Sequence, residues 1–206
     1  MVPAGTSVAV LLAAGAGSRL GRGPKALVPH HGRPLVAHVA DVLSDGGCDV
    51  VVVVLGCEAE QVAGAAGLDR DRVHAVVNPD WESGMASSLL VGVRAALGLG
   101  PERVVVAHVD QPGLVPDDVA RLLAAHRPGR VAASRWTGAV GPEGSARWAH
   151  PLVLDAALAG PAATSAHGDQ GARDFLRAHA DLIDVVDHPG DGRDLDTEAD
   201  LDLLTG

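Results

Sequence analysis

A glycine-rich stretch near the start of the chain combines small residues with positive charge. Residues 11–28 read LLAAGAGSRLGRGPKALV and hold four glycines, two arginines and a lysine, but no acidic residue. Glycines permit positive φ angles and let the backbone approach a ligand closely, and exposed N–H groups in such a loop bind anions. Because Arg19 adds a planar cation and Lys25 a point charge, the loop predicts a cradle for phosphate groups.

Two better-known phosphate loops do not fit this stretch. A dinucleotide-binding fingerprint needs G-x-G-x-x-G, whereas three residues separate Gly17 from Gly21. A Walker A loop needs Gly-Lys followed by Ser or Thr, and this chain has Pro24-Lys25-Ala26 instead. A plain flexible connection between a strand and a helix is the remaining alternative.

Two further segments place polar side chains where a ligand could meet them. Ser87 and Ser88, in GMASSL, fall near the start of a predicted helix, where free hydroxyls and N–H groups would face a ligand or form an ordinary cap. Asp110 follows the apolar run RVVVAHV. A carboxylate at the end of a buried strand suits Mg²⁺ with phosphate oxygens, and a turn residue before Pro112 is the alternative.

The elements that must position these residues alternate along the chain. Apolar runs predict strands over residues 8–12, 49–56, 73–77 and 103–110, and helical patterns cover 35–43, 59–66, 86–97 and 115–126. After residue 130 we expect a strand over 131–134, a Gly/Pro-rich loop or hairpin over 136–151, a helix over 171–180, a strand over 182–186 and a closing helix over 197–204. This order predicts one α/β domain, residues 1–206, with a Rossmann-like, doubly wound, mostly parallel sheet flanked by helices. Ligands of such sheets bind beyond the carboxyl ends of the strands.

Composition excludes several classes of function. The formal net charge is -10, which argues against binding of nucleic acid. No apolar run approaches the ~20 residues of a membrane span and no signal peptide is visible, so we expect a cytoplasmic protein. The two cysteines fit no zinc pattern and are expected to be reduced thiols. The ten histidines form no metal-binding pattern, and we expect His30, His31 and His108 to be structural or solvent-facing.

The residues 12–27, LAAGAGSRLGRGPKAL, resemble the signature L-A-A-G-x-G-x-R-x-G-x-x-K of the MobA-like nucleotidyltransferases of molybdenum cofactor synthesis. GMASSL and the DQP that begins at Asp110 are similar to segments of the cytidylyltransferase branch of that family. HGDQGARDFL and DLDTEADL resemble its G-D-x-G-A-R segment and its carboxyl-terminal tail. The chain departs from the family in two places: three residues, not two, separate Gly21 from Lys25, and Ala149 stands where the family has glycine before His-Pro.

The resemblance implies a fold like that of nucleotide-diphospho-sugar transferases, in which about residues 1–112 bind the nucleoside triphosphate and about residues 113–206 bind the acceptor. It implies that the nucleotide is bound by Leu12, Ala13, Ala14, Gly15, Ala16, Gly17, Ser18, Arg19, Lys25, Gly84, Ser87 and Ser88. The implied catalytic residues are Arg19, Lys25 and Asp110, with Mg²⁺ on Asp110 and Asp169. The implied acceptor-binding residues are His150, Asp169 and Arg173, although Arg173 could instead pair with a surface acid.

We therefore expect a Mg²⁺-dependent nucleotidyltransferase. It would move a nucleotidyl group from a nucleoside triphosphate, CTP rather than GTP, to the phosphate of an acceptor such as molybdopterin, and release pyrophosphate. One alternative is an oxidoreductase that uses NAD(P)H, because some proteins with this loop are named nicotine blue oxidoreductases, although no flavin or dinucleotide fingerprint is present. The other is a non-catalytic nucleotide-binding or chaperone domain that serves a molybdoenzyme, against which the presence of Asp110 and Lys25 argues.

Overall fold

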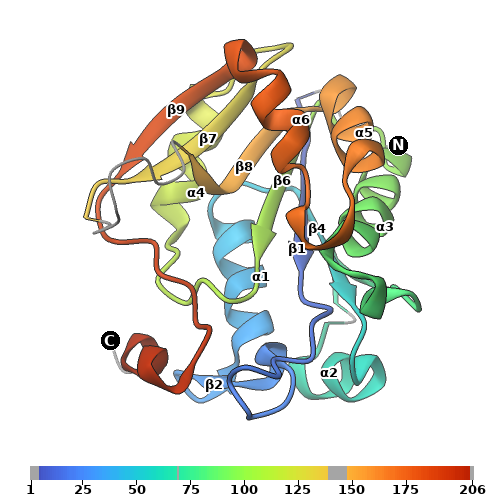
Figure 1. Cartoon of the computed structure of the whole chain (residues 1–206), viewed down its shortest axis with the longest axis vertical. Helices are drawn as coiled ribbons and strands as arrows, with labels where there is room; N and C mark the ends of the chain where they lie inside the picture. The colour runs from blue at the N-terminus through green and yellow to red at the C-terminus, as the bar shows by residue number, and fades with distance from the viewer. Residues whose placement is uncertain (1–4, 69, 139–147, 205–206) are drawn as a thin grey trace.

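One central sheet organises the computed structural model of the chain, which describes residues 5–68, 70–138 and 148–204 (Figure 1). Within those residues seven strands follow the order β5-β4-β1-β6-β8-β7-β9. Their bounds are β1 Ser7–Leu12, β4 Val50–Leu55, β5 Val73–Val77, β6 Arg103–His108, β7 Val131–Trp136, β8 Ala149–Asp155 and β9 Ile183–His188. β8 runs antiparallel to both of its neighbours, and the other pairs are parallel. The predicted doubly wound, mostly parallel, single-domain fold is confirmed.

Helices cover both faces of this sheet. On one face lie α1 (Leu35–Asp45), α2 (Ala59–Ala66) and α4 (Pro116–Ala125), and on the other lie α3 (Met85–Gly98), α5 (Ala156–Ser165) and α6 (Arg173–Ala178). A short hairpin of β2 (Pro29–His30) and β3 (Arg33–Pro34) precedes α1. None of the helices in the described ranges has the length and apolar character that crossing a membrane requires.

The period of two along β1 explains the two apolar cores. Ala9 and Leu11 pack toward α1 and α4, whereas Val8 and Val10 pack toward α3 and α5. Small side chains bring these layers close together: a Cβ on Gly92 of α3 would lie 2.4 Å from Cγ1 of Val10. Because the core consists of Val, Leu and Ala, helices and sheet must approach closely to fill it.

The second half of the chain differs from the sequence expectation. β8 begins inside the predicted loop or hairpin over 136–151 and continues beyond it, and α5 lies in a stretch for which no element was predicted. Residues 139–147 of the predicted loop lie outside the described residues. Asp155 begins α5 by accepting a hydrogen bond from Ala157 N at 2.9 Å. The predicted closing helix is instead a 3₁₀ segment, η5 (Glu198–Leu204).

The carboxyl ends of β1 and β6 define the edge at which a ligand is expected. β1 connects through α1 to β4 on one side, and β6 lies on its other side, so the strand order reverses between β1 and β6. Ligands of open α/β sheets bind at such a reversal. Figure 1 shows the dark-blue loop after β1 at this edge, and the red segment after β9 descends toward the same end of the molecule.

Candidate active site

The glycine-rich loop leaves β1 and folds back on itself. Ala13 N donates to Val54 O at 3.0 Å, which holds the start of the loop against β4. Gly17 has a φ of 64°, and a Cβ there would lie 2.3 Å from the carbonyl oxygen of Gly23, so only glycine fits this approach. Residues 15–19 are exposed or half-buried, and within the described residues their N–H groups make no hydrogen bond. They are therefore available to an anion, as the sequence predicted.

Lys25 is the cation at the centre of the site. It begins the short 3₁₀ segment η1 (Lys25–Leu27), and its side chain is only 13% exposed. Its Nζ lies 3.0 Å from Asp110 Oδ2 and 2.6 Å from Asp196 Oδ1. Burial lowers the pKa of Lys25, but the charges and hydrogen bonds of Asp110 and Asp196 outweigh it and raise the pKa overall. Lys25 thus stays charged and reaches the site in spite of the additional residue after Gly21.

Asp110 stands where β6 ends. Its backbone oxygen accepts a hydrogen bond from Leu195 N at 2.7 Å, so the carboxyl-terminal segment is fastened beside it. Asp110 Oδ2 contacts Lys25, whereas Oδ1 is buried and has no hydrogen-bond partner among the described residues. A buried oxygen of this kind is costly unless a ligand or cation meets it.

The carboxyl-terminal segment adds two carboxylates that sequence reasoning missed. Leu195 is fully buried, and Asp194 and Asp196 flank it. Besides Lys25, Asp196 contacts Arg19, whose Nη2 lies 3.3 Å from Oδ1 and whose side chain is 72% exposed. The available signal is the pair of acids around one apolar residue in DLDTEADL.

The carboxylates of this cluster repel one another. Desolvation first, and then the charges of Asp110 and Asp196, raise the pKa of Asp194 to about 6. In the part of the chain that the structure describes, no group of three or more His, Cys, Asp or Glu side chains is already arranged around a metal position. The carboxylates are instead gathered around the ammonium group of Lys25, which occupies the place of a cation.

The start of α3 differs in detail from the expectation. Asn78 Nδ2 donates to Ser87 Oγ at 2.8 Å and to Ser88 Oγ at 3.0 Å, and Ser88 is buried. The expectation that both hydroxyls are free to face a ligand is therefore wrong, because they tie α3 to the end of β5. Gly84, with φ 114°, precedes the helix. Of the first three N–H groups, Met85 N donates to Asp169 Oδ1 and Ser87 N to Gly84 O, so among the described residues only Ala86 N has no hydrogen-bond partner.

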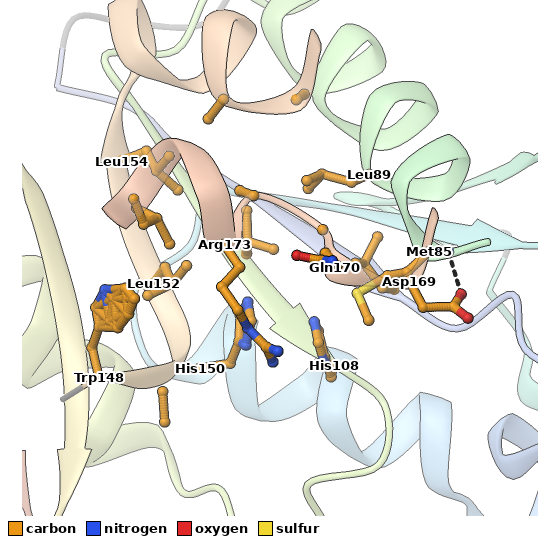
Figure 2. Close-up of a pocket in the computed structure, with 18 of the residues that line it drawn as sticks. Met85, Leu89, His108, Trp148, His150, Leu152, Leu154, Asp169, Gln170 and Arg173 are labelled. Atoms are coloured by element: carbon orange, nitrogen blue, oxygen red, sulfur yellow. Dashed lines mark hydrogen bonds between the residues drawn. The ribbon is translucent and has the colours of Figure 1, made fainter. Parts of the chain in front are cut away.

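Asp169 lies beside this helix start. Its Oδ1 accepts a hydrogen bond from Met85 N at 3.2 Å, and Figure 2 shows its carboxylate directed toward Met85 and away from Arg173. A Cβ on Gly84 would lie 2.7 Å from the carbonyl carbon of Gly168, so the two segments are in close contact. Asp169, implied as a second metal ligand, here holds the start of α3 against the 3₁₀ segment η3 (Gly168–Gln170).

A large cavity opens next to the carboxylates. Its volume is about 1030 Å³, and its lining extends from Arg19, Asp110 and Asp196 to side chains of β8, α3, α5 and α6. The rings of His108 and His150 stack within it with centroids 4.0 Å apart. Arg173 projects toward both rings in Figure 2. The implied acceptor residues His150 and Arg173 therefore share one cavity with Asp110, and His108 joins them although it was expected to be structural or solvent-facing.

Comparison with known proteins shows similarity along almost the whole chain. The family model described as MobA-like NTP transferase domain matches residues 9–182. The chain is 48% identical over 190 residues to a nicotine blue oxidoreductase of Paenarthrobacter nicotinovorans, and the alignment covers 91% of each chain. The family model thus includes the loop, Lys25, Asp110 and the residues of the cavity as far as Ala180.

Two further similarities concern nucleotidyl transfer. The chain is 40% identical over 133 residues to the CMP-5'-(3-aminopropyl)phosphonate synthase of Streptomyces rubellomurinus, an alignment that spans 62% of this chain but only 20% of that protein. A nucleotidyl transferase from Methanothermobacter thermautotroptrophicus has the same fold, with a TM-score of 0.80 and 25% identity, and the match covers 97% of this chain and 96% of that one.

Proposed function

The chain belongs to the family of MobA-like NTP transferase domains, and from this membership we propose that it transfers a nucleotidyl group from a nucleoside triphosphate to a phosphate-bearing acceptor. The observation that carries the proposal is the position of Lys25, in contact with Asp110 and Asp196 and next to a loop with free N–H groups. Phosphoryl transfer requires a cation, backbone amides and carboxylates close together, and here they lie where the strand order reverses.

The residues of the site have distinct roles in this reaction. An oxygen of the acceptor phosphate attacks the α-phosphorus in line, and the bond to pyrophosphate breaks. Lys25 and Arg19 neutralise the phosphates of the leaving group, and the N–H groups of residues 15–19 orient their oxygens. No protein nucleophile or general base is required, because the acceptor phosphate is already an anion.

The carboxylates fit a divalent cation. The unpartnered, buried Oδ1 of Asp110 and the neighbouring Asp196 offer the oxygen ligands that Mg²⁺ prefers. When bound, Mg²⁺ would supply the positive charge that lets triphosphate and carboxylates lie side by side. In the absence of nucleotide, Lys25 neutralises the same carboxylates. We therefore propose Asp110 and Asp196 as the metal ligands. Asp169, which the sequence resemblance implied as a ligand, instead accepts a hydrogen bond at the start of α3.

We propose CTP as the nucleotide and the second half of the chain as the acceptor-binding part. GMASSL, which resembles the cytidylyltransferase segment, supports CTP, as does the similarity to a CMP-phosphonate synthase. Because Ser87 and Ser88 are tied to Asn78, the base would meet Ala86 N at the start of α3 rather than these hydroxyls. Molybdopterin is a candidate acceptor on the sequence resemblance alone, and a cytoplasmic location agrees with such a substrate.

A second candidate function is an oxidoreductase. It is favoured by the 48% identity with a nicotine blue oxidoreductase across 91% of both chains. In that case NAD(P)H would donate the electrons, and the cavity beside His108 and His150 would hold the molecule that is reduced.

Binding and turnover distinguish these functions. Thermal unfolding with CTP, GTP, ATP or UTP and Mg²⁺ tests the nucleotide, because a ligand at ~100 times its Kd adds about 2.7 kcal/mol to the free energy of unfolding. Pyrophosphate release with CTP and molybdopterin would support the proposal. Oxidation of NAD(P)H by the purified protein, with no stabilisation by any triphosphate, would overturn it in favour of the reductase. Nucleotide binding with no release of pyrophosphate from any acceptor would indicate a non-catalytic domain.

A further inference from the structure

The floor of the cavity changes in polarity along two paired strands. Val106 and His108 lie on one face of β6, two residues apart, and Asp110 follows after two more. On β8, Leu152 is the register partner of Val106, and His150 lies two residues before it. A strand advances about 3.3 Å per residue, so successive steps along this floor are roughly 7 Å. From Asp110 inward, the side chains that form the floor are therefore a carboxylate, then an imidazole, then an aliphatic group.

The inner end of the cavity is enclosed by small and branched apolar side chains. Leu89 of α3, Ala162 and Ala163 of α5 and Leu176 of α6 line it, and they belong to the apolar core on that face. Figure 2 shows Leu89 and Leu154 facing the same space from opposite sides. A ligand that reaches this end must offer apolar surface, because contact with polar groups would leave those groups without hydrogen bonds.

The middle of the cavity carries two stacked histidine rings and the guanidinium of Arg173. Burial lowers the pKa of His150 well below its usual value, so this ring is neutral near pH 7. The buried Nε2 of His108 has no hydrogen-bond partner within the described residues. Arg173 forms no ion pair there, whereas Arg177 pairs with Asp174 at 3.4 Å. This level suits one hydrogen-bonding or singly anionic group and not a string of charges.

We propose that the acceptor of this enzyme has a predominantly apolar body, with a single polar group at His108 and Arg173 and its reacting phosphate at the Asp110 end of the cavity. The inference rests on the proposed function for the reacting end and names the class of acceptor. It separates such molecules from sugar phosphates and other richly hydroxylated acceptors, whose polar groups would face Leu152 and Ala162 unpaired. It also disfavours acceptors with several charged or polar groups along their length, which includes molybdopterin with its polar pterin rings.

Two probes with the same phosphate head and different bodies test this inference. The affinity of the full-length protein for 1-naphthyl phosphate and for ribose 5-phosphate is measured by calorimetry. We expect naphthyl phosphate to bind at least about tenfold more tightly, a difference of ~1.4 kcal/mol. Equal affinities of the unchanged protein for the two probes, or tighter binding of ribose 5-phosphate, would overturn the inference.

A matched pair of variants locates the binding. Ala162→Leu fills the inner end of the cavity, and Ala157→Leu adds the same atoms to the exposed face of the same helix. We expect Ala162→Leu to weaken naphthyl phosphate about tenfold and to leave ribose 5-phosphate unchanged, whereas Ala157→Leu changes neither. An unchanged affinity of a folded Ala162→Leu protein for naphthyl phosphate would place the probe elsewhere and refute the inference. Should this variant fail to fold, Ala162→Val, which fills the same end of the cavity with fewer added atoms, takes its place with the same expectation.

Titration with CTP and Mg²⁺ in the same series separates this inference from the proposed function. CTP binding with no preference for naphthyl phosphate would refute the apolar acceptor and leave nucleotidyl transfer intact. Preference for naphthyl phosphate with no binding of any triphosphate would keep the apolar ligand class and refute nucleotidyl transfer.

Discussion

Replacement of Asp196 by asparagine should raise the affinity for the nucleotide in the absence of metal. This gain should disappear or reverse when Mg²⁺ is present. The carboxylate of Asp196 lies 2.6 Å from Lys25 Nζ and 3.3 Å from Arg19 Nη2, so it neutralises both cations that we assign to the phosphates. Asparagine keeps the shape of the side chain and removes its charge. Without metal, the triphosphate then no longer competes with Asp196 for Lys25 and Arg19.

The size of this effect follows from the geometry. A unit charge about 5 Å from a phosphate oxygen contributes about 3 kcal/mol at an effective dielectric constant of about 20. The side chain of Asp196 is 34% exposed, and solvent screening reduces this to about 1–2 kcal/mol. We therefore expect CTP to bind about 5- to 30-fold more tightly to Asp196→Asn in EDTA. With Mg²⁺ the advantage should disappear or reverse, because a metal ligand has been lost.

Calorimetric titration of CTP in EDTA and in excess Mg²⁺ measures the change in CTP affinity in each condition. Asp181→Asn is the matched control, because it makes the same change in net charge at an exposed residue. Asp181 lies just before the amino end of the edge strand β9, whereas Lys25 follows the carboxyl end of the central strand β1. The control should bind CTP as the unchanged protein does in both solutions. Equal affinity of Asp196→Asn and the unchanged protein in EDTA, or the same gain with and without Mg²⁺, would refute the reasoning.

Three other substitutions test the remaining charges of the site. Lys25→Ala should weaken CTP binding by about 10- to 100-fold, the worth of a charge-assisted hydrogen bond, and suppress pyrophosphate release; unchanged kinetics of the folded variant would contradict its role. Asp110→Asn should lower kcat strongly, change the Kd of CTP little and raise the Mg²⁺ requirement, and normal turnover at low Mg²⁺ would point to another metal ligand. Asp194 has a folded pKa of about 6, above its usual 3.8, so the unchanged protein loses unfolding free energy as pH rises from about 4 to about 6. Asp194→Asn lacks this loss and should be more stable near pH 7 by about 1 kcal/mol, a value reduced because solvent reaches this side chain. Urea unfolding at a series of pH values measures the difference. The same pH dependence of the free energy of unfolding in both proteins would contradict the prediction.

The first half of the fold could be predicted because its signals are local. The strands β1, β4 and β6 are continuous apolar runs, and such runs are typical of parallel strands covered on both faces. β8 and α5 lack comparable signals. Pro151 lies inside β8, a position that argues against a strand. α5 reads AALAGPAATS, with Pro161 inside it and small residues on every side, so it has no apolar stripe.

The site was partly predictable for a related reason. Arg19, Lys25 and Asp110 could be proposed because residue type and position after a strand indicate phosphate and metal chemistry. Asp196 could not, because its role comes from contact with Lys25 across 171 positions of the chain. His108 was missed because a histidine inside an apolar strand has no local sign of what it faces. Its stacking on His150 exists only once β8 lies beside β6.

During synthesis, β6 leaves the ribosome well before the strand that completes it. β6 ends at His108 and β8 begins at Ala149, so about 40 residues must be added before the two can pair. At about 5–20 residues per second this takes roughly 2–8 s. Throughout that time the nascent amino-terminal half exposes an unpaired edge whose residues 104–106 are all valine, and such edges pair readily with other chains. The interval between the synthesis of β6 and that of β8 is therefore a stage at which the growing polypeptide is open to aggregation.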